Sequence, residues 1–382
     1  MKNILYIHAG AEMYGADKIL LEIVKGIDKK RFNPIVVLPT DGILKDKLLE
    51  IGVEVHVVNY PILRRKYFNI HGITSYIRAY RKKSQEIIKL LKGTKIDIIH
   101  ANTTAVLEGI YLKYKLQAKL IWHVHEIITT PKFMNVIISF LVGRFSDTVI
   151  TVSEAVRNNL IKTKLVSSKK VKILYNGVDN VDVKKVNSSY LYKEFSIPTN
   201  AIKIGMIGRI NAWKGQEDFI KALTPILKGD SNVYAFIVGG VFAGEEWRID
   251  NIKKIIRESG VSRQFRLSDF RNDVPELLNF FDFFVLPSNR PDPLPTVVLE
   301  AMSVGKAIVS YGHGGAVEMI VNNETGYLAT PKNVQDLSMK IKKMIKNPQK
   351  TRKMGELALE RQREIFNKNR FIKEIEKIYL YK

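Results

Sequence analysis

The sequence of 382 residues contains no cysteine. This absence excludes disulfide bridges, thiolate metal sites and cysteine nucleophiles. Long apolar runs are absent as well, because no stretch reaches the roughly eighteen consecutive apolar residues that a membrane-spanning helix needs. The opening residues, MKNILYIHAG, are too short for a secretory signal and lead directly into a strand, a loop and a helix. We therefore expect a protein that stays in the cytoplasm.

Acidic residues are few compared with basic ones. The 38 Asp and Glu residues face 61 Lys and Arg residues, which gives a formal net charge of +23. Such a charge suits nucleic acid, an anionic membrane or phosphorylated substrates, and it also arises in lysine-rich proteomes without a functional reason. The basic residues do not interleave with aromatic ones as in a known nucleic-acid module. Composition alone leaves these alternatives open.

Short apolar strands alternate with helices along the chain, and the length predicts two or three domains. Strands that are apolar throughout and separated by helices indicate parallel sheets covered on both faces. The expected strands span 2–8, 35–38, 53–58, 96–100, 120–124, 148–152, 202–207, 234–238, 265–267, 283–286 and 307–310. Because the pattern restarts after a polar stretch at 176–200, we predict an α/β fold of two doubly wound Rossmann-like domains joined by that stretch.

Residues 286–306, LPSNRPDPLPTVVLEAMSVGK, follow one of the predicted strands. Ligands of doubly wound sheets bind at the carboxyl ends of the strands. The prolines interrupt regular structure, and Pro295 suits the first turn of a helix. Asp292 then lies in the loop and Glu300 on the helix. Since a free helix N-terminus favours anions, we expect a ligand here.

Two other loops have the composition of phosphate-binding turns. Residues 208–215, GRINAWKG, open a helix, so Arg209 and Lys214 flank a helix N-terminus. Residues 9–15 form a small-residue loop in which Gly10 and Gly15 allow a ligand to approach the backbone, although the spacing is not the dinucleotide fingerprint. Both loops are candidates for a phosphorylated ligand.

The run Trp122-His123-Val124-His125-Glu126 ends another predicted strand. Alternation puts His123 and His125 on one face, where they would suit a metal pair. The adjacent Glu126 points to the opposite face, so the run lacks a third ligand. We therefore predict no metal site.

Taken in order, these motifs resemble those of the retaining glycosyltransferase family 4, whose fold, GT-B, has two such domains facing across a cleft. The family signature is two acids separated by seven residues and followed by Ala-Met and a Gly. Here these are Asp292, Glu300, Ala301, Met302 and Gly305. The resemblance implies that Asp292 contacts the donor sugar and that Glu300 holds the ribose hydroxyls of the nucleotide. This sequence departs from the family pattern at Asp292, because most family members have glutamate at that position.

The resemblance assigns roles to the other motifs as well. Arg209 and Lys214 occupy the diphosphate-binding positions, and the loop 271–273, with Arg271, lies near the nucleotide base. His125, in the pattern His125-Glu126, lies near the reacting sugar, where it would bind a hydroxyl or assist proton movement. His313-Gly314-Gly315 lies where the family often contacts the donor sugar or phosphate, and a plain glycine turn is the equal alternative. His100-Ala101-Asn102, at another strand end, and Asn176-Gly177-Val178-Asp179, which resembles the closing motif of the family's first domain, are interpreted as supporting residues.

The Asp-X-Asp motif, which holds Mg²⁺ or Mn²⁺ in glycosyltransferases of the other major fold, is missing. Cationic side chains and helix dipoles would replace the ion. We therefore predict metal-independent transfer, with the nucleotide sugar as substrate and no cofactor.

The sequence is thus interpreted as a retaining glycosyltransferase that moves a hexosyl or related sugar from a nucleotide sugar to a glycan or lipid-linked acceptor, in the synthesis of a bacterial surface polysaccharide. The predicted domains are 1–180 for the acceptor and 181–361 for the nucleotide sugar, with a helix at 362–382 that packs back on the first. The alternatives are a phosphorylase-like enzyme of the same fold, a basic nucleic-acid-binding protein and a catalytically inactive scaffold.

Residues 64–95 contain ten basic residues against one acid, Glu86. Aromatic and aliphatic residues, among them Tyr67, Phe68 and Ile73, interleave with this charge as in an interfacial helix. We therefore predict that this segment binds an anionic membrane close to a lipid-linked acceptor. A solvated helix face, or contact with an acidic sugar acceptor, is the alternative.

Overall fold

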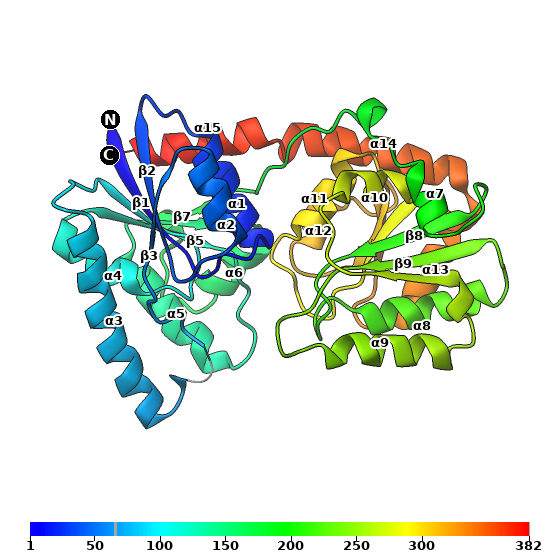
Figure 1. Cartoon of the computed structure of the whole chain (residues 1–382), viewed down its shortest axis with the longest axis horizontal. Coiled ribbons are helices and arrows are strands. Elements are labelled where there is room, and N and C mark those ends of the chain that lie inside the picture. Colours follow the sequence, from blue (N-terminus) through cyan, green and yellow to red (C-terminus); the bar gives the residue numbers. More distant parts are fainter. Residues whose placement is uncertain (65–66, 382) are drawn as a thin grey trace. The chain divides into compact units, whose positions relative to one another are not determined.

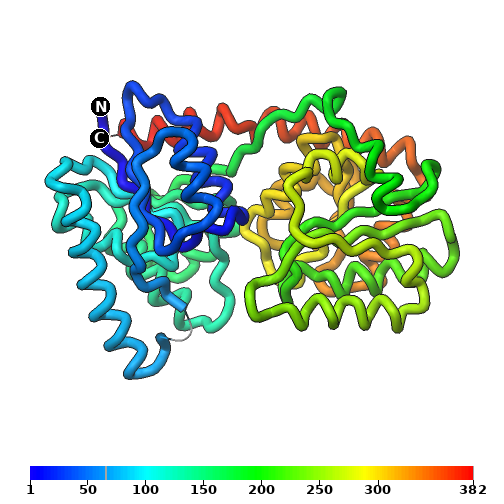
Figure 2. The backbone as a smooth tube through the Cα atoms, viewed as in Figure 1, coloured from blue at the N-terminus to red at the C-terminus, as the bar shows by residue number. Residues whose placement is uncertain are grey.

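The computed structural model describes residues 1–64 and 67–381 (Figures 1 and 2). It divides into two compact units, one formed by Met1–Asn176 with Lys368–Lys382 and the other by Gly177–Asn367. The sequence placed the corresponding boundaries at 180 and 361. Each unit contains its own parallel sheet, so the predicted fold class is confirmed.

The first unit is built on a seven-stranded parallel sheet in the order β3-β2-β1-β4-β5-β6-β7. Its strands are β1 (Lys2–Ile7), β2 (Phe32–Leu38), β3 (Glu54–Val57), β4 (Ile98–Ala101), β5 (Lys119–Val124), β6 (Thr148–Thr151) and β7 (Val171–Ile173). The central β1 is fully buried from Ile4 to Ile7, which explains its unbroken apolar run. The sequence did not predict β7, because this three-residue strand is largely exposed and has no apolar run.

Helices flank this sheet and bury one apolar stripe each. They are α1 (Gly15–Gly26), α2 (Ile43–Glu50), α3 (Ile70–Leu90), α4 (Glu108–Leu116), α5 (Lys132–Phe145), α6 (Glu154–Ile161) and α15 (Lys368–Leu380). In α1 the buried residues include Leu20, Ile23 and Val24, and Ile23 and Val24 follow Leu20 by the three and four residues that place side chains on one helix face.

The last helix, α15, completes the core of the first unit. It runs beside α1, and the two chain termini lie close together (Figures 1 and 2). Ile372 of α15 packs so closely on Gly26 that a Cβ atom there would lie 2.8 Å from it. The Tyr379 hydroxyl lies 3.0 Å from the Tyr6 hydroxyl and 2.9 Å from Nδ1 of His100. The end of the chain is therefore part of the first sheet's core.

The second unit is built on a six-stranded parallel sheet in the order β10-β9-β8-β11-β12-β13. Its strands are β8 (Ile202–Ile207), β9 (Val233–Val238), β10 (Phe265–Ser268), β11 (Phe283–Leu286), β12 (Ile308–Tyr311) and β13 (Gly326–Ala329). The predictions for β8 and β11 match to the residue. The edge strand β13 was not predicted, since its four residues begin with a glycine and contain only two aliphatic residues.

The helices of the second unit are α7 (Tyr190–Glu194), α8 (Gln216–Leu227), α9 (Trp247–Glu258), α10 (Val274–Phe280), α11 (Thr296–Ser303), α12 (Ala316–Met319), α13 (Val334–Lys346) and α14 (Pro348–Ile365). The polar stretch 176–200, predicted as a linker, contains α7. From Gly177 onward it belongs to the second unit, where Val178 pairs with Asn367. Among residues 1–64 and 67–381, no helix is long and apolar enough to cross a membrane.

Candidate functional site

Lys214 and Asp292 are paired at the carboxyl edge of the second sheet. Lys214 lies in the loop between β8 and α8, and Asp292 lies in the loop between β11 and α11. The strands β8 and β11 are parallel neighbours, so the two loops leave the sheet side by side. The Lys214 ammonium donates a hydrogen bond to the Asp292 carboxylate. Since the side chains are only 23% and 19% exposed, solvent screens this ion pair less than it screens a surface pair.

Two glycines make this close approach possible. Gly215 has φ +82°, and a Cβ atom there would lie 1.9 Å from the carbonyl oxygen of Pro287. Gly314 has φ +60°, and its Cβ would lie 2.4 Å from the carbonyl oxygen of Asp292. Only glycine adopts this backbone conformation freely and fits this space. The glycines of the two motifs thus fix the loop that carries Asp292.

Arg209 begins the same β8–α8 loop. Its guanidinium carbon lies 3.5 Å from the centre of the Phe242 ring, a close cation–π contact. The side-chain amide of Gln216 donates to the Arg209 carbonyl at 3.0 Å. The Phe242 contact restrains the guanidinium, whose planar fork suits phosphate oxygens, and the Gln216 hydrogen bond fixes the backbone of the loop.

The second acid of the signature lies on α11. Glu300 is half-buried in the second turn of this helix, which begins directly after Pro295. Ala301 and Met302 are fully buried and attach the helix to the core. The last residue of the motif, Gly305, has φ +70° just beyond the helix end, which glycine adopts without strain.

Arg271 is bound by two carboxylates. Its guanidinium contacts Asp273 through Nε at 2.8 Å and Glu194 through Nη2 at 3.2 Å. Hydrogen bonding to Asp273 and Glu194 raises the pKa of Arg271 further, and Arg271 lowers the pKa of Asp273 to about 2. In this structure Arg271 therefore ties its loop to α7.

The glycine turn after β12 is also anchored. His313 donates from Nε2 to the carbonyl oxygen of Ser288 at 2.6 Å. The backbone N–H of Gly315 donates to the Asp292 carbonyl at 2.7 Å. The motif that the sequence left open between donor contact and plain turn thus packs directly on the Asp292 loop.

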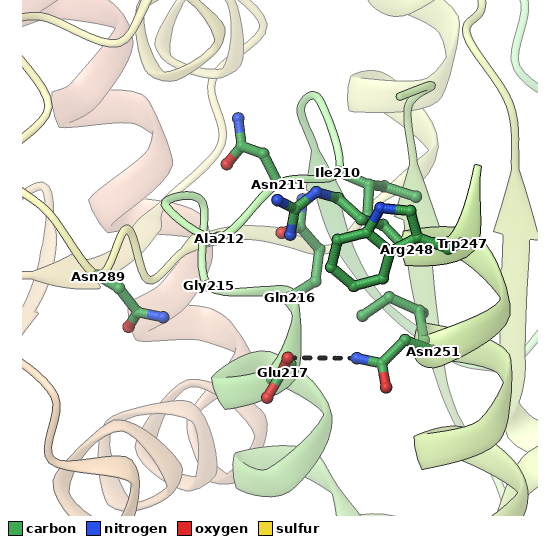
Figure 3. A pocket seen from close by; sticks show the side chains of 11 residues that line it. Ile210, Asn211, Ala212, Gly215, Gln216, Glu217, Trp247, Arg248, Asn251 and Asn289 are labelled. Atoms are coloured by element: carbon green, nitrogen blue, oxygen red, sulfur yellow. Dashed lines mark hydrogen bonds between the residues drawn. The ribbon is translucent and has the colours of Figure 1, made fainter. Parts of the chain in front are cut away.

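A pocket of about 110 Å³ opens beside the β8–α8 loop (Figure 3). Gln216 and Asn289 each have a buried side-chain carbonyl oxygen without a hydrogen-bond partner in the part of the chain described here. Such acceptors suit a ligand with hydroxyl or N–H groups. Sequence reasoning did not find this pocket, which is lined by Ile210, Asn211, Ala212, Gly215, Gln216, Glu217, Trp247, Arg248, Asn251, Ile252 and Asn289.

In the first unit, four polar side chains form a buried chain at the carboxyl ends of β1, β4 and β5. His8 Nε2 lies 2.5 Å from the carboxylate of Asp17. On its other side, His8 Nδ1 lies 3.1 Å from Nδ2 of Asn102. Asn102 Oδ1 accepts a hydrogen bond from Nε2 of His125 at 3.1 Å. The predicted His125 is therefore held in place through two partners, His8 and Asp17, that the sequence did not reveal.

Burial sets the protonation of this chain. It lowers the pKa of His125 to about 3, with His8 and His100 adding to the effect, so this imidazole is neutral at pH 7. Burial by itself would raise the pKa of Asp17, but the hydrogen bond from His8 and the amides of Tyr14 and Glu12 lower it instead. The Asp17 carboxyl is therefore ionised at pH 7, whereas the His125 imidazole is neutral.

The histidines do not form a metal site in the described structure. The rings of His123 and His125 lie 4.1 Å apart between centroids, as strand alternation predicted, and His100 Nε2 lies 3.2 Å from Nδ1 of His123. Across residues 1–64 and 67–381, however, no three ligating side chains are arranged to hold a metal ion. Burial lowers the pKa of His123 and His100, so these rings form a cluster of neutral imidazoles.

Glu126 and Gly15 flank this network. Thr103 donates its hydroxyl to the Glu126 carboxylate, and the Thr104 amide lies 3.3 Å from it. Burial raises the pKa of Glu126 despite these donors. Gly15 is the first residue of α1, and its neighbour Tyr14 donates its amide to Asp17 at 3.0 Å. The first loop is therefore organised around Asp17, at the start of α1.

Two family models match consecutive parts of the chain. The model described as Glycosyltransferase Family 4 matches residues 13–181, and the model described as Glycosyl transferases group 1 matches residues 191–361. The chain belongs to glycosyltransferase family 4.

Several proteins are similar to this glycosyltransferase along most of its length. One is an N,N'-diacetylbacillosaminyl-diphospho-undecaprenol α-1,3-N-acetylgalactosaminyltransferase of Campylobacter jejuni, 27% identical over 89% of this chain and 88% of its own. Another is an N-acetyl-α-D-glucosaminyl L-malate synthase of Bacillus anthracis, 24% identical over 88% of this chain and 91% of its own. Among solved structures, Alr3699/HepE of Anabaena in complex with UDP-glucose is 25% identical, with a TM-score of 0.85 and 99% of both chains covered.

Proposed function

We propose that this glycosyltransferase moves a sugar, with retention of its anomeric configuration, from a nucleotide-sugar donor to a glycan or lipid-linked acceptor of a bacterial surface polysaccharide. The observation that carries the proposal is the cationic loop of Arg209 and Lys214 beside the acid Asp292, at one edge of the second sheet. The similar Anabaena protein was solved with UDP-glucose, which supports a uridine nucleotide as the first donor to try.

The diphosphate is the proposed ligand of Arg209 and Lys214. When the bond from the anomeric carbon to the β-phosphate oxygen breaks, the leaving diphosphate takes the electron pair and gains negative charge. Cations fixed in a partly buried loop stabilise this charge more than that of the ground state, and this difference accelerates the reaction. The same cations would replace a metal ion. The proposed roles of Asp292 and Glu300 are to contact the donor sugar and the ribose.

In the first unit, His125 is the proposed contact of the reacting sugar. A neutral imidazole held by Asn102 can hydrogen bond to a sugar hydroxyl without bringing a charge near the forming bond. At Gly15, which has no side chain beyond Cα, the backbone is proposed to approach the ligand closely. For Arg271, whose guanidinium is bound by Glu194 and Asp273, we propose an indirect contribution that shapes the loop near the nucleotide base.

A membrane-bound acceptor is proposed because of the basic helix α3. Arg78, Arg81 and Lys82 of this helix are exposed, and each basic residue near an anionic surface adds about 1 kcal/mol. Lys83 is instead paired with Glu86 at 2.7 Å, and the predicted residues Arg65 and Lys66 lie outside the described residues. The similar Campylobacter jejuni enzyme is named for a diphospho-undecaprenol-linked acceptor, which supports a lipid-linked acceptor here.

Calorimetric titration of the protein with nucleoside diphosphates and nucleotide sugars tests the proposal. Wild type is expected to bind one diphosphate and its sugar, and Arg209→Ala is expected to lose about ten- to a hundredfold in affinity, the value of one charge-assisted hydrogen bond. Phe242→Leu is the control that removes the stacking partner and keeps the charge. Absence of nucleotide binding, with binding of inorganic phosphate and absorbance from pyridoxal phosphate, would favour the phosphorylase alternative.

A further inference from the structure

The helix α5 is apolar on both of its faces. Its inner face buries Met134, Ile138 and Val142 together with the polar Asn135 and Ser139. A second apolar stripe lies on the solvent side, at the spacing of three and four residues that defines one helix face. It consists of Phe133, Val136, Ile137 and Phe140, each 45–54% exposed. A second apolar stripe that faces solvent indicates that this side of the helix meets an apolar partner.

The first half of α3 extends this stripe. Ile70, Ile73 and Ile77 are 81%, 51% and 45% exposed and recur every three to four residues. The ring of Phe68, just before α3, lies 6.3 Å from the ring of Phe133 and joins the two helices. Figure 1 shows α3 and α5 at the same end of the first unit. We call the resulting surface the docking face, composed of Phe68, Ile70, Ile73, Ile77, Phe133, Val136, Ile137 and Phe140.

Basic residues accompany the docking face. On α5 the exposed charged residues are Lys132 and Arg144, and the helix sequence contains no acid. On α3 the exposed residues Arg78, Arg81 and Lys82 follow the apolar turns, and the single acid of this helix, Glu86, is paired with Lys83. An apolar face with flanking charges of one sign complements an anionic bilayer, whose phosphates lie above its acyl chains.

We propose that the docking face inserts into the interfacial layer of an anionic lipid bilayer, with α3 and α5 lying along the membrane plane. The inference rests on the membrane association proposed above and adds to it α5, whose exposed apolar stripe the sequence did not predict. A helix of 14 residues is about 21 Å long and cannot span a bilayer, so it lies on the surface. Docking of a second copy would bring the same basic residues together, and like charges at an interface oppose association.

Vesicle sedimentation tests the docking face directly. Wild type is expected to sediment with vesicles of phosphatidylcholine and phosphatidylglycerol at low salt, and much less with phosphatidylcholine alone. The variant Phe133→Asn with Phe140→Asn is expected to lose about tenfold or more in partitioning, since two inserted rings return to water. The matched control, Leu49→Asn with Met339→Asn, changes two side chains of similar exposure (48% and 55%) outside the docking face and is expected to sediment as wild type.

Two further measurements distinguish the ways in which the membrane proposal could be wrong. The variant Arg81→Glu with Lys82→Glu tests the charges alone. Thermal unfolding of every variant checks that both units are folded, and titration with UDP reports donor binding. If the phenylalanine variant sediments as wild type while the charge variant does not, insertion of the docking face is overturned and electrostatic membrane association stands. If wild type binds neither vesicle, both membrane proposals fail, while UDP binding still tests the glycosyltransferase. If wild type is a dimer that the phenylalanine variant makes monomeric, with vesicle binding unchanged, the docking face is an interface between copies and the inference is wrong.

Discussion

The ammonium of Lys214 is paired with the carboxylate of Asp292, 78 residues away in the sequence. The two residues come from different motifs, one predicted to bind the diphosphate and the other the donor sugar. Their pairing means that, before a donor binds, the positive charge of Lys214 is compensated by an acid of the same site. If Lys214 binds the diphosphate as proposed, the diphosphate competes with Asp292 for it.

Substitution of Asp292 tests this competition. Asp292→Asn removes the competing charge, so we expect UDP affinity to be kept or to rise several-fold while sugar transfer falls at least about tenfold. Lys214→Ala should instead weaken UDP binding, because the cation itself is lost. Titration calorimetry and initial rates measure the two effects. Loss of UDP affinity in both variants would contradict the competition, and recovery of transfer by Asp292→Glu, the commoner family residue, would identify the carboxylate as the active group.

Substitutions of His125 and Glu300 are expected to impair different steps of the reaction. Glu300→Ala should mainly weaken nucleotide binding, since the proposed contact is the ribose. His125→Ala should lower kcat with nucleotide affinity nearly unchanged. The control is His56→Ala, because His56 lies on β3 and pairs only with the exposed Glu54 in the described structure. Equal losses of nucleotide affinity in the Glu300 and His125 variants would refute this division of roles.

Transfer should persist in excess chelator. This expectation follows from the cationic loop of Arg209 and Lys214, which is proposed to neutralise the diphosphate in place of an ion. Initial rates are compared with and without EDTA after dialysis. Complete loss of activity on chelation, restored by Mg²⁺ or Mn²⁺, would show that the cations alone are insufficient.

The buried carboxyl of Glu108 should make the free energy of unfolding depend on pH. Its carboxyl is buried in the first turn of α4, and burial raises its pKa to about 8 from 4.5. Between these values the unfolded chain releases a proton that the folded chain keeps. The free energy of unfolding should therefore fall as pH rises from 4.5 to about 8, by up to about 1.4 kcal/mol per pH unit.

The variant Glu108→Gln should remove this slope and be more stable than wild type at pH 7. Urea denaturation at several pH values measures the difference. The control is Glu217→Gln, whose half-exposed carboxylate should leave the slope unchanged. If wild type and Glu108→Gln show the same pH profile, Glu108 does not hold its proton in the folded state.

Most strands could be predicted from the sequence for a physical reason. Buried parallel strands are apolar throughout, so β8 and β11 could be predicted to the residue. The two acids and the glycines are recognisable because each loop admits few residue types. The short edge strands β7 and β13 lack that composition and were missed.

Contacts between distant residues could not be predicted in the same way. Nothing in the spacing shows that Asp17 pairs with His8, that Asp292 pairs with Lys214, or that Glu194 binds Arg271. The exposed stripe of α5 was missed for another reason. An apolar run without periodicity looks the same in a sequence whether its second face meets protein or solvent.

The position of α15 has a consequence for synthesis. Residues 368–380 leave the ribosome after the whole second unit, yet Phe371, Ile375 and Tyr379 are buried in the first unit. The second unit can therefore complete its core while the first, although translated earlier, still exposes the apolar surface that α15 covers. A nascent chain released before residue 368 would carry a finished second unit and an unfinished first unit around His125, and quality-control proteases would act on the first unit first.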